Sequence, residues 1–111
     1  MSRQAQDCIL VIDDEAEIRT LLRSALEAEG FRVLEAANAQ DAYAHFNQAP
    51  ISLVTLDLNL AGADGLTIAR ELRAKKNTPI VMITGKGDAV DRIVGALEET
   101  VFAIRCKLVA V

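Results

Sequence analysis

Ile9-Leu10-Val11-Ile12-Asp13-Asp14 is the stretch that decides the fold: a short apolar run followed at once by two adjacent carboxylates. A second run of this kind, Leu53-Val54-Thr55-Leu56, is followed by Asp57. Such runs are typical of strands that are buried on both faces of a parallel sheet. Because the carboxyl ends of parallel strands lie along one edge, we expect Asp13, Asp14 and Asp57 to meet there.

Carboxylates gathered at one edge repel one another. At a separation of ~4 Å and an effective dielectric constant of ~20, each pair costs roughly 4 kcal/mol. A hard divalent cation, which prefers oxygen ligands, can offset that cost. The sequence therefore predicts a divalent-cation site at this edge of the sheet.

The composition limits what the chain can do. It has 111 residues, of which 51% are hydrophobic and 25% charged, which is enough for one small domain with a packed core. The net charge of −4 argues against a general surface for nucleic acid or acidic membranes. No apolar stretch is long enough to span a bilayer, and Met1–Asp7 lacks the order of a signal peptide, so we expect a cytoplasmic domain. Cys8 and Cys106 lack metal-ligand spacing and are expected to be free thiols.

Strand and helix patterns alternate along the chain. Turn-forming residues separate these patterns, at Gly30, Pro50 and Asn77-Thr78-Pro79. The predicted strands are residues 9–12, 31–36, 53–56 and 80–83, and the predicted helices run from about 16 to 29, from the cap Asn38 to about 47, from Gly65 to about 76, and onward from the cap Asp88. This alternation predicts an α/β fold with a parallel sheet and helices on both faces.

The spacing of apolar residues predicts which helix faces are buried. Arg19 and Arg23 are expected on the outer face of the first helix. The expected inner positions are Ile18, Leu21, Leu22, Ala25 and Leu26 in the first helix, Ala42 and Phe46 in the second, and Leu66, Ile68, Ala69 and Leu72 in the third.

Three motifs together resemble the receiver domain of two-component response regulators. They are Val11-Ile12-Asp13-Asp14-Glu15, residues 56–65 (LDLNLAGADG) and Val81-Met82-Ile83-Thr84-Gly85. The resemblance covers residues 8 to about 95 and implies a flavodoxin-like, doubly wound parallel sheet of strand order 2-1-3-4, with a fifth strand in doubt. Residues 86–95 resemble most closely the class that carries a winged-helix DNA-binding output domain, although none follows here.

The resemblance also implies the chemistry. Asp57 would be the phosphoacceptor that takes a phosphoryl group from a histidine kinase or phosphotransfer protein, without turning over a diffusing substrate. Mg²⁺ would be the cofactor. It would be held by Asp14, Asp57 and the carbonyl group of Asn59, and Asp13 would act mostly through a metal-bound water. Thr84 and Gly85 would contact the phosphoryl group and switch a protein-interaction surface.

The resemblance weakens after Gly95, which divides a receiver core (1–95) from an atypical tail (96–111). If residues 101–107 form the fifth strand, Lys107 can match the phosphate-binding lysine of the family with one inserted residue. If instead the helix from Asp88 continues, apolar residues repeat at alternating spacings of 4 and 3, which is a heptad seam. The seam consists of Val90, Val94, Leu97, Val101, Ile104, Leu108 and Val111. We favour the long helix and expect a homodimer through residues 90–111.

Two other functions stay open beside the receiver reading. The domain could be a dimeric interaction module whose signalling has degenerated, because the lysine and last helix of the family are displaced or missing. It could also be a phosphohydrolase of the haloacid dehalogenase type. That class needs Asp-x-Asp after its first strand, which Asp13-Asp14-Glu15 lacks, so it ranks last.

Overall fold

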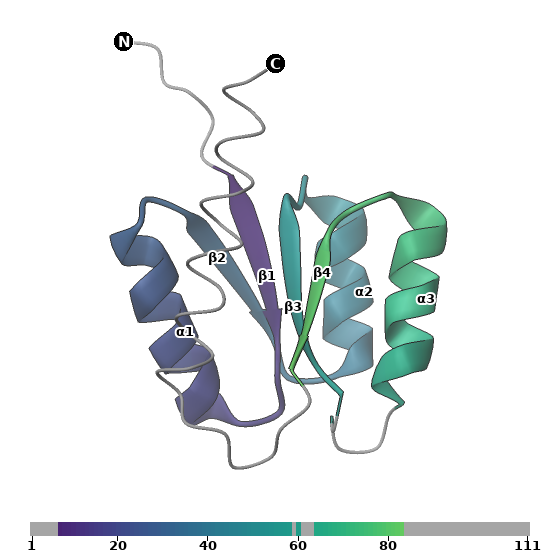
Figure 1. Ribbon diagram of the computed structural model, residues 1–111, viewed down its shortest axis with the longest axis horizontal. Helices are drawn as coiled ribbons and strands as arrows, with labels where there is room; N and C mark the ends of the chain where they lie inside the picture. Colours follow the sequence, from purple (N-terminus) through teal and green to yellow (C-terminus); the bar gives the residue numbers. More distant parts are fainter. Residues whose placement is uncertain (1–6, 59, 61–63, 84–111) are drawn as a thin grey trace, which may run out of the picture.

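The computed structural model describes residues 7–58, 60 and 64–83 (Figure 1). The elements are β1 (Cys8–Ile12), α1 (Ala16–Ala28), β2 (Arg32–Ala36), α2 (Ala39–Gln48), β3 (Leu53–Asp57), α3 (Gly65–Lys75) and β4 (Ile80–Ile83). The strands pair in parallel in the order β2-β1-β3-β4, which confirms the predicted order. The expected fifth strand, the helix from Asp88 and the tail lie outside the described residues.

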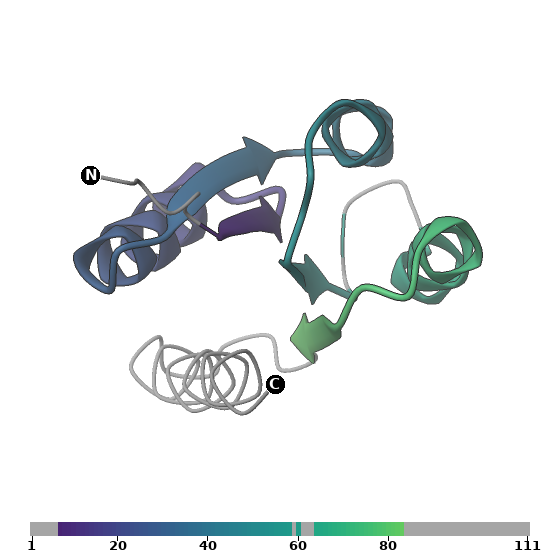
Figure 2. The ribbon, with the colours of Figure 1, turned by 90° about the horizontal axis from the view of Figure 1, so that it is seen from above.

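Helices cover both faces of the sheet. α1 lies on one face, and α2 and α3 lie on the other (Figure 2). Successive strand residues point to opposite faces, so a strand between two helical layers must be apolar at every position. This explains the uninterrupted burial of β1 from Cys8 to Ile12. Within the described part of the chain, no helix is both long and apolar enough to cross a membrane.

The helix ends follow local chemistry. Gly30 has a positive φ of 94°, and its N–H donates to the Glu27 carbonyl oxygen while the Phe31 N–H donates to that of Leu26. These two bonds satisfy carbonyl groups that α1 leaves unpaired at its end. Asn38 caps α2 by accepting from the Asp41 N–H at 2.8 Å. The predicted stop at Gly30 and cap at Asn38 are both confirmed.

Two of the apolar residues expected in the core are exposed instead. Leu21 is 45% exposed, whereas its neighbour Leu22 is fully buried, because successive residues are rotated by about 100° around a helix and α1 meets the sheet with one narrow stripe. Leu66 is 48% exposed in the first turn of α3. The prediction that both point inward is therefore wrong.

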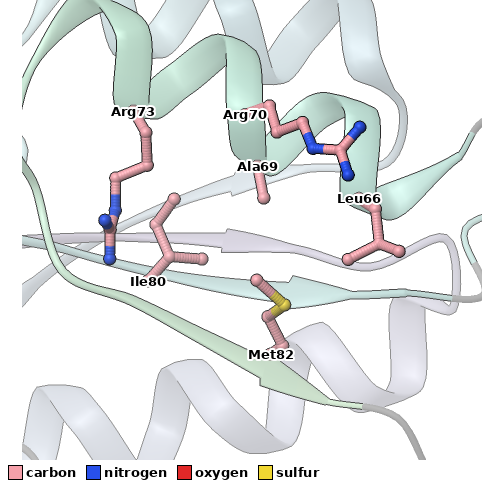
Figure 3. A pocket seen from close by; sticks show the side chains of 6 residues that line it. All are labelled: Leu66, Ala69, Arg70, Arg73, Ile80 and Met82. Carbon is pink, nitrogen blue, oxygen red and sulfur yellow. The ribbon is translucent and has the colours of Figure 1, made fainter.

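Leu66 instead lines a groove of about 430 Å³ between α3 and β4. Its side chain and that of Met82 point into this groove from opposite sides (Figure 3). The lining residues are Leu66, Ala69, Arg70, Arg73, Ile80 and Met82.

Gly65 lies where α3 approaches the end of β3 most closely. A Cβ atom at this position would be 2.7 Å from the Leu58 Cα and 3.1 Å from the Leu58 carbonyl oxygen. Both atoms belong to the backbone and cannot rotate away. Asp64, which precedes Gly65, caps α3 by accepting from the Leu66 N–H. This close packing fixes the start of α3 against the residue that follows Asp57.

We predict that Gly65→Ala lowers the free energy of unfolding by about 1–3 kcal/mol, the usual cost of forcing an extra methyl group into packed space. The sign is informative because replacing a helical glycine by alanine ordinarily stabilises by roughly 0.5–1 kcal/mol. Urea denaturation of the two proteins measures the difference, with the exposed-site variant Ser24→Ala as control. An increase in stability for Gly65→Ala would contradict the close packing.

Candidate metal centre

The sheet brings three carboxylates together at its carboxyl edge. Asp57 is the last residue of β3, and Asp13 and Asp14 directly follow β1. Ile12 pairs with Leu56 across these two strands, so the next residues along each chain segment, Asp13 and Asp57, are neighbours. One carboxylate oxygen from each aspartate lies within 4.8 Å of the others. The edge therefore offers several anionic oxygen ligands to one ion.

The three aspartates differ in their surroundings. Asp13 is 4% exposed, and its Oδ1 accepts from the Glu15 N–H at 2.9 Å. Asp14 is exposed, and Asp57 is half-buried. The cluster thus has one buried member that is fixed by a backbone bond and two members that solvent can reach.

The pKa of Asp13 shows the cost of this arrangement. Burial, as the main cause, raises it to about 6, the Glu15 N–H lowers it, and repulsion from Asp57, Asp14 and Glu15 raises it further. A bound cation would favour the charged form of these carboxylates. Hard divalent ions such as Mg²⁺ take carboxylate oxygens as ligands. The donor set and the electrostatic cost at Asp13 both fit a divalent cation.

Hydrogen bonds also hold the backbone of Asp13. Its N–H donates to the Ala36 carbonyl oxygen at 3.0 Å, and its own carbonyl oxygen accepts from Arg19 Nη1 at 2.8 Å. Arg19 Nε donates to Glu35 Oε1 at 2.9 Å. The other carboxylate oxygen of Glu35 accepts from Arg23 Nη1. These bonds tie the loop after β1 to the end of β2.

This network was not predicted from the sequence, because the apolar spacing places Arg19 and Arg23 on the outer face of α1. That placement is wrong for Arg19, whose side chain is only 17% exposed. The missing partner was Glu35, a carboxylate inside the second predicted strand. A carboxylate inside a predicted strand indicates that a cationic or hydrogen-bonding partner lies beside it, but it does not identify which residue supplies that partner.

Several predicted site residues fall outside the residues that the structure describes. They are Asn59, Thr84, Gly85, Lys107 and the seam residues Val90, Val94, Leu97, Val101, Ile104, Leu108 and Val111. Their roles stay predictions, as do those of the three aspartates that the structure brings together.

Residues 9–104 match the response regulator receiver domain family, and the chain belongs to that family. It is thus a receiver domain of two-component response regulators, a class of signalling modules. The transcriptional regulatory protein ResD of Bacillus subtilis is 44% identical over 95 residues, which are 86% of this chain and 40% of ResD. The chain spans less than half the length of the curated relatives that it matches.

Solved structures show the same fold. A two-component response regulator from Clostridium difficile superimposes with a TM-score of 0.80 at 23% identity, covering 93% of this chain and 98% of that one. The response regulator TrrA from Thermotoga maritima, solved in complex with Mg²⁺–BeF, gives a TM-score of 0.70 at 28% identity, covering 89% of this chain and 99% of TrrA. The predicted flavodoxin-like arrangement is confirmed.

The raised pKa of Asp13 predicts a pH dependence of stability in metal-free solution. The folded protein binds this proton more tightly than the unfolded chain does, since the pKa rises from 3.8 to about 6 on folding. The stabilisation is therefore complete below pH ~4 and is lost as the pH rises to ~6.

Denaturant titrations from pH 3.5 to 7.5, with EDTA present, measure this effect. Asp13→Asn keeps the acceptor for the Glu15 N–H but cannot titrate, so it is the matched control. The stability of the wild type minus that of Asp13→Asn should fall between pH ~4 and ~6 and then level off. A difference that is flat or that rises across this window would contradict the assigned environment.

Proposed function

We propose that Asp57 accepts a phosphoryl group from a phosphohistidine on a histidine kinase or phosphotransfer protein. The observation that carries this proposal is the convergence of Asp57 with Asp13 and Asp14 at the open edge of the sheet. A carboxylate is a competent nucleophile in aspartyl-phosphate chemistry. A carboxylate oxygen of Asp57 forms the new bond to phosphorus, and the phosphorus–nitrogen bond of the donor breaks. The donor imidazole, already protonated at its other ring nitrogen, leaves as neutral imidazole.

The environments of the three aspartates favour Asp57 as the acceptor. Asp13 is buried, and its Oδ1 is engaged by the Glu15 N–H. Asp14 lies in the loop after β1, where its carboxylate is exposed. Asp57 ends β3, which lies between β1 and β4 in the sheet, so residues from both neighbouring strands flank it. This half-buried position combines access for a donor with support from two sides.

Asp13, Asp14 and Asp57 would hold Mg²⁺, with the Asn59 carbonyl as a further ligand. TrrA, a relative of this chain, was solved with Mg²⁺–BeF, which supports the choice of metal. When bound, Mg²⁺ supplies positive charge that offsets the charge gathering on the phosphoryl oxygens. Asp13 contributes a fixed oxygen because both its backbone and its Oδ1 are hydrogen-bonded.

Phosphorylation would act as a switch. It raises the charge at Asp57 from −1 to about −2 and adds acceptor oxygens. Thr84 directly follows β4 in the sequence, so its hydroxyl is our candidate donor to one of these oxygens, with Gly85 leaving space beside it. Lys107 is the candidate cationic partner. The result would be a changed protein-binding surface, with no turnover of a diffusing substrate.

Phosphate incorporation tests this function. Incubated with Mg²⁺ and acetyl phosphate, the wild type should gain one covalent phosphate by intact-mass measurement, and Asp57→Asn should gain none. EDTA should abolish the gain. Asp57→Asn removes one of three mutually repelling charges, so we expect it to fold at least as well as the wild type.

Asp41→Asn, which removes an exposed carboxylate on α2, is the matched control and should be phosphorylated like the wild type. Incorporation that persists in Asp57→Asn would place the acceptor elsewhere. A wild type that takes up no phosphate under these conditions would overturn the function itself.

We further propose that the chain forms a homodimer through residues 90–111 and works in the cytoplasm. The support for the dimer is the heptad seam in the sequence. The free thiol of Cys8, buried in β1, is compatible with a reducing compartment. We propose no nucleic-acid binding by these residues, because the chain has a net charge of −4.

Sedimentation analysis of the full chain tests the dimer. The wild type should sediment as a dimer, and Leu97→Lys should be monomeric because it places a charge in the seam. Thr100→Lys adds the same charge outside the seam and should stay dimeric. A monomeric wild type, or equal behaviour of the two lysine variants, would argue against this interface.

A further inference from the structure

We propose that Arg19 is a positioning residue for the metal centre: held in place by Glu35, it fixes the peptide that joins Asp13 to Asp14. This inference rests on the proposed function, because it concerns the ability of that same site to bind Mg²⁺. Arg19 itself touches neither the ion nor the phosphoryl group in this proposal. Its action passes through the backbone of Asp13.

The guanidinium group of Arg19 bonds in two directions at once. Nη1 donates to the Asp13 carbonyl oxygen at 2.8 Å, and Nε donates to Glu35 Oε1 at 2.9 Å. The side chains of Arg19 and Glu35 are 17% and 24% exposed, so both bonds are largely shielded from water. Hydrogen bonds that involve a charged group are roughly twice as strong as neutral ones. The Arg19–Glu35 pair therefore holds the Asp13 carbonyl oxygen firmly in place.

The Asp13 carbonyl group belongs to the planar peptide unit that leads to Asp14. Only three residues, 13 to 15, separate the end of β1 from the start of α1. Asp13 is held on its N-terminal side, where its N–H donates to the Ala36 carbonyl oxygen. On its C-terminal side, the Glu15 N–H bond to Asp13 Oδ1 also crosses the loop, but Arg19 is the side chain that bonds the peptide oxygen itself. Removing Arg19 would loosen this peptide and, with it, the position of the Asp14 carboxylate.

Glu35 has a second effect, since it keeps the guanidinium group on the carbonyl oxygen. An arginine near three carboxylates would otherwise pair with one of them, because guanidinium and carboxylate groups match in geometry. The Glu35 carboxylate bonds the Nε side of the Arg19 guanidinium group and neutralises its positive charge. Arg23 secures the far side, where it donates to Glu35 and, through Nη2 at 3.1 Å, to the Val33 carbonyl oxygen.

The positioning role can be separated from a plain charge effect because the two predict opposite results. If Arg19 acted only as a positive charge near the site, removing it would tighten Mg²⁺ binding, since like charges repel. If it positions Asp13 and Asp14, removing it loosens the site. Substituting a group that orients a metal ligand typically weakens metal affinity by about 10- to 100-fold.

The experiment measures the Mg²⁺ dissociation constant of the full chain by isothermal titration calorimetry. Arg19→Gln should bind Mg²⁺ at least about tenfold more weakly than the wild type. Arg32→Gln is the matched control: it removes the same charge at the exposed first residue of β2, outside the network of Arg19, Glu35 and Arg23, so its affinity should equal that of the wild type. Equal or tighter binding by Arg19→Gln would overturn the inference.

Arg19→Lys covers the case in which the glutamine variant does not fold. It keeps the charge, so a charge effect predicts an unchanged dissociation constant. An ammonium group lacks the planar fork that spans Asp13 and Glu35 together. Weaker Mg²⁺ binding by Arg19→Lys supports positioning, and unchanged binding overturns it.

Phosphorylation by acetyl phosphate at rising Mg²⁺ concentration separates this inference from the proposed function. The Arg19 variants should need more Mg²⁺ for half-maximal phosphate incorporation, but they should reach the plateau of the wild type. A general structural defect would lower the plateau instead and would overturn the positioning role.

If the wild type takes phosphate and the Arg19 variants have its Mg²⁺ dependence, the function stands and the inference fails. If the wild type binds neither Mg²⁺ nor phosphate, both fail.

Discussion

Repulsion among Asp13, Asp14 and Asp57 is the constraint on which the rest of the site depends. The parallel sheet forces these carboxylates together, because β1 and β3 are neighbours and run in the same direction. Apolar packing on both faces of the sheet stabilises this arrangement in spite of the local cost. The fold thereby maintains an electrostatic repulsion that a cation can relieve, and this is the physical basis of the proposed Mg²⁺ site.

The aspartates of the site differ in burial and in hydrogen bonding, and these differences suit them to different roles in the proposed function. Asp13 is deep and held by hydrogen bonds to its backbone and its side chain. Asp57 is reachable at the end of a central strand, where a donor can approach. In the proposed function, Asp13 is a buried anchor for the cation and Asp57 an accessible nucleophile, so charge neutralisation and phosphoryl transfer would not compete for the same group. Membership in the receiver domain family is consistent with this division.

The sequence predicted the strands and the meeting of the aspartates because both follow from short-range patterns. Continuous apolar runs define parallel strands, and chain direction then places Asp13 and Asp57 at one edge. It failed at Leu21 and Leu66, where periodicity shows an apolar stripe but not how much of that stripe the sheet covers. It also failed at Arg19, since the contact with Glu35 joins residues that are 16 positions apart. Such contacts depend on packing that no local pattern encodes.

The contact between Gly65 and Leu58 has a consequence for signalling. Leu58 is bonded directly to Asp57, and the start of α3 lies against its backbone with no room for even a methyl group. Incompressible contacts transmit displacement, because neither side can yield independently. A shift of the peptide after Asp57 would therefore reach α3 as a whole, and α3 carries one wall of the groove that contains Leu66. This contact thus offers a mechanical route from the acidic edge to a surface on α3.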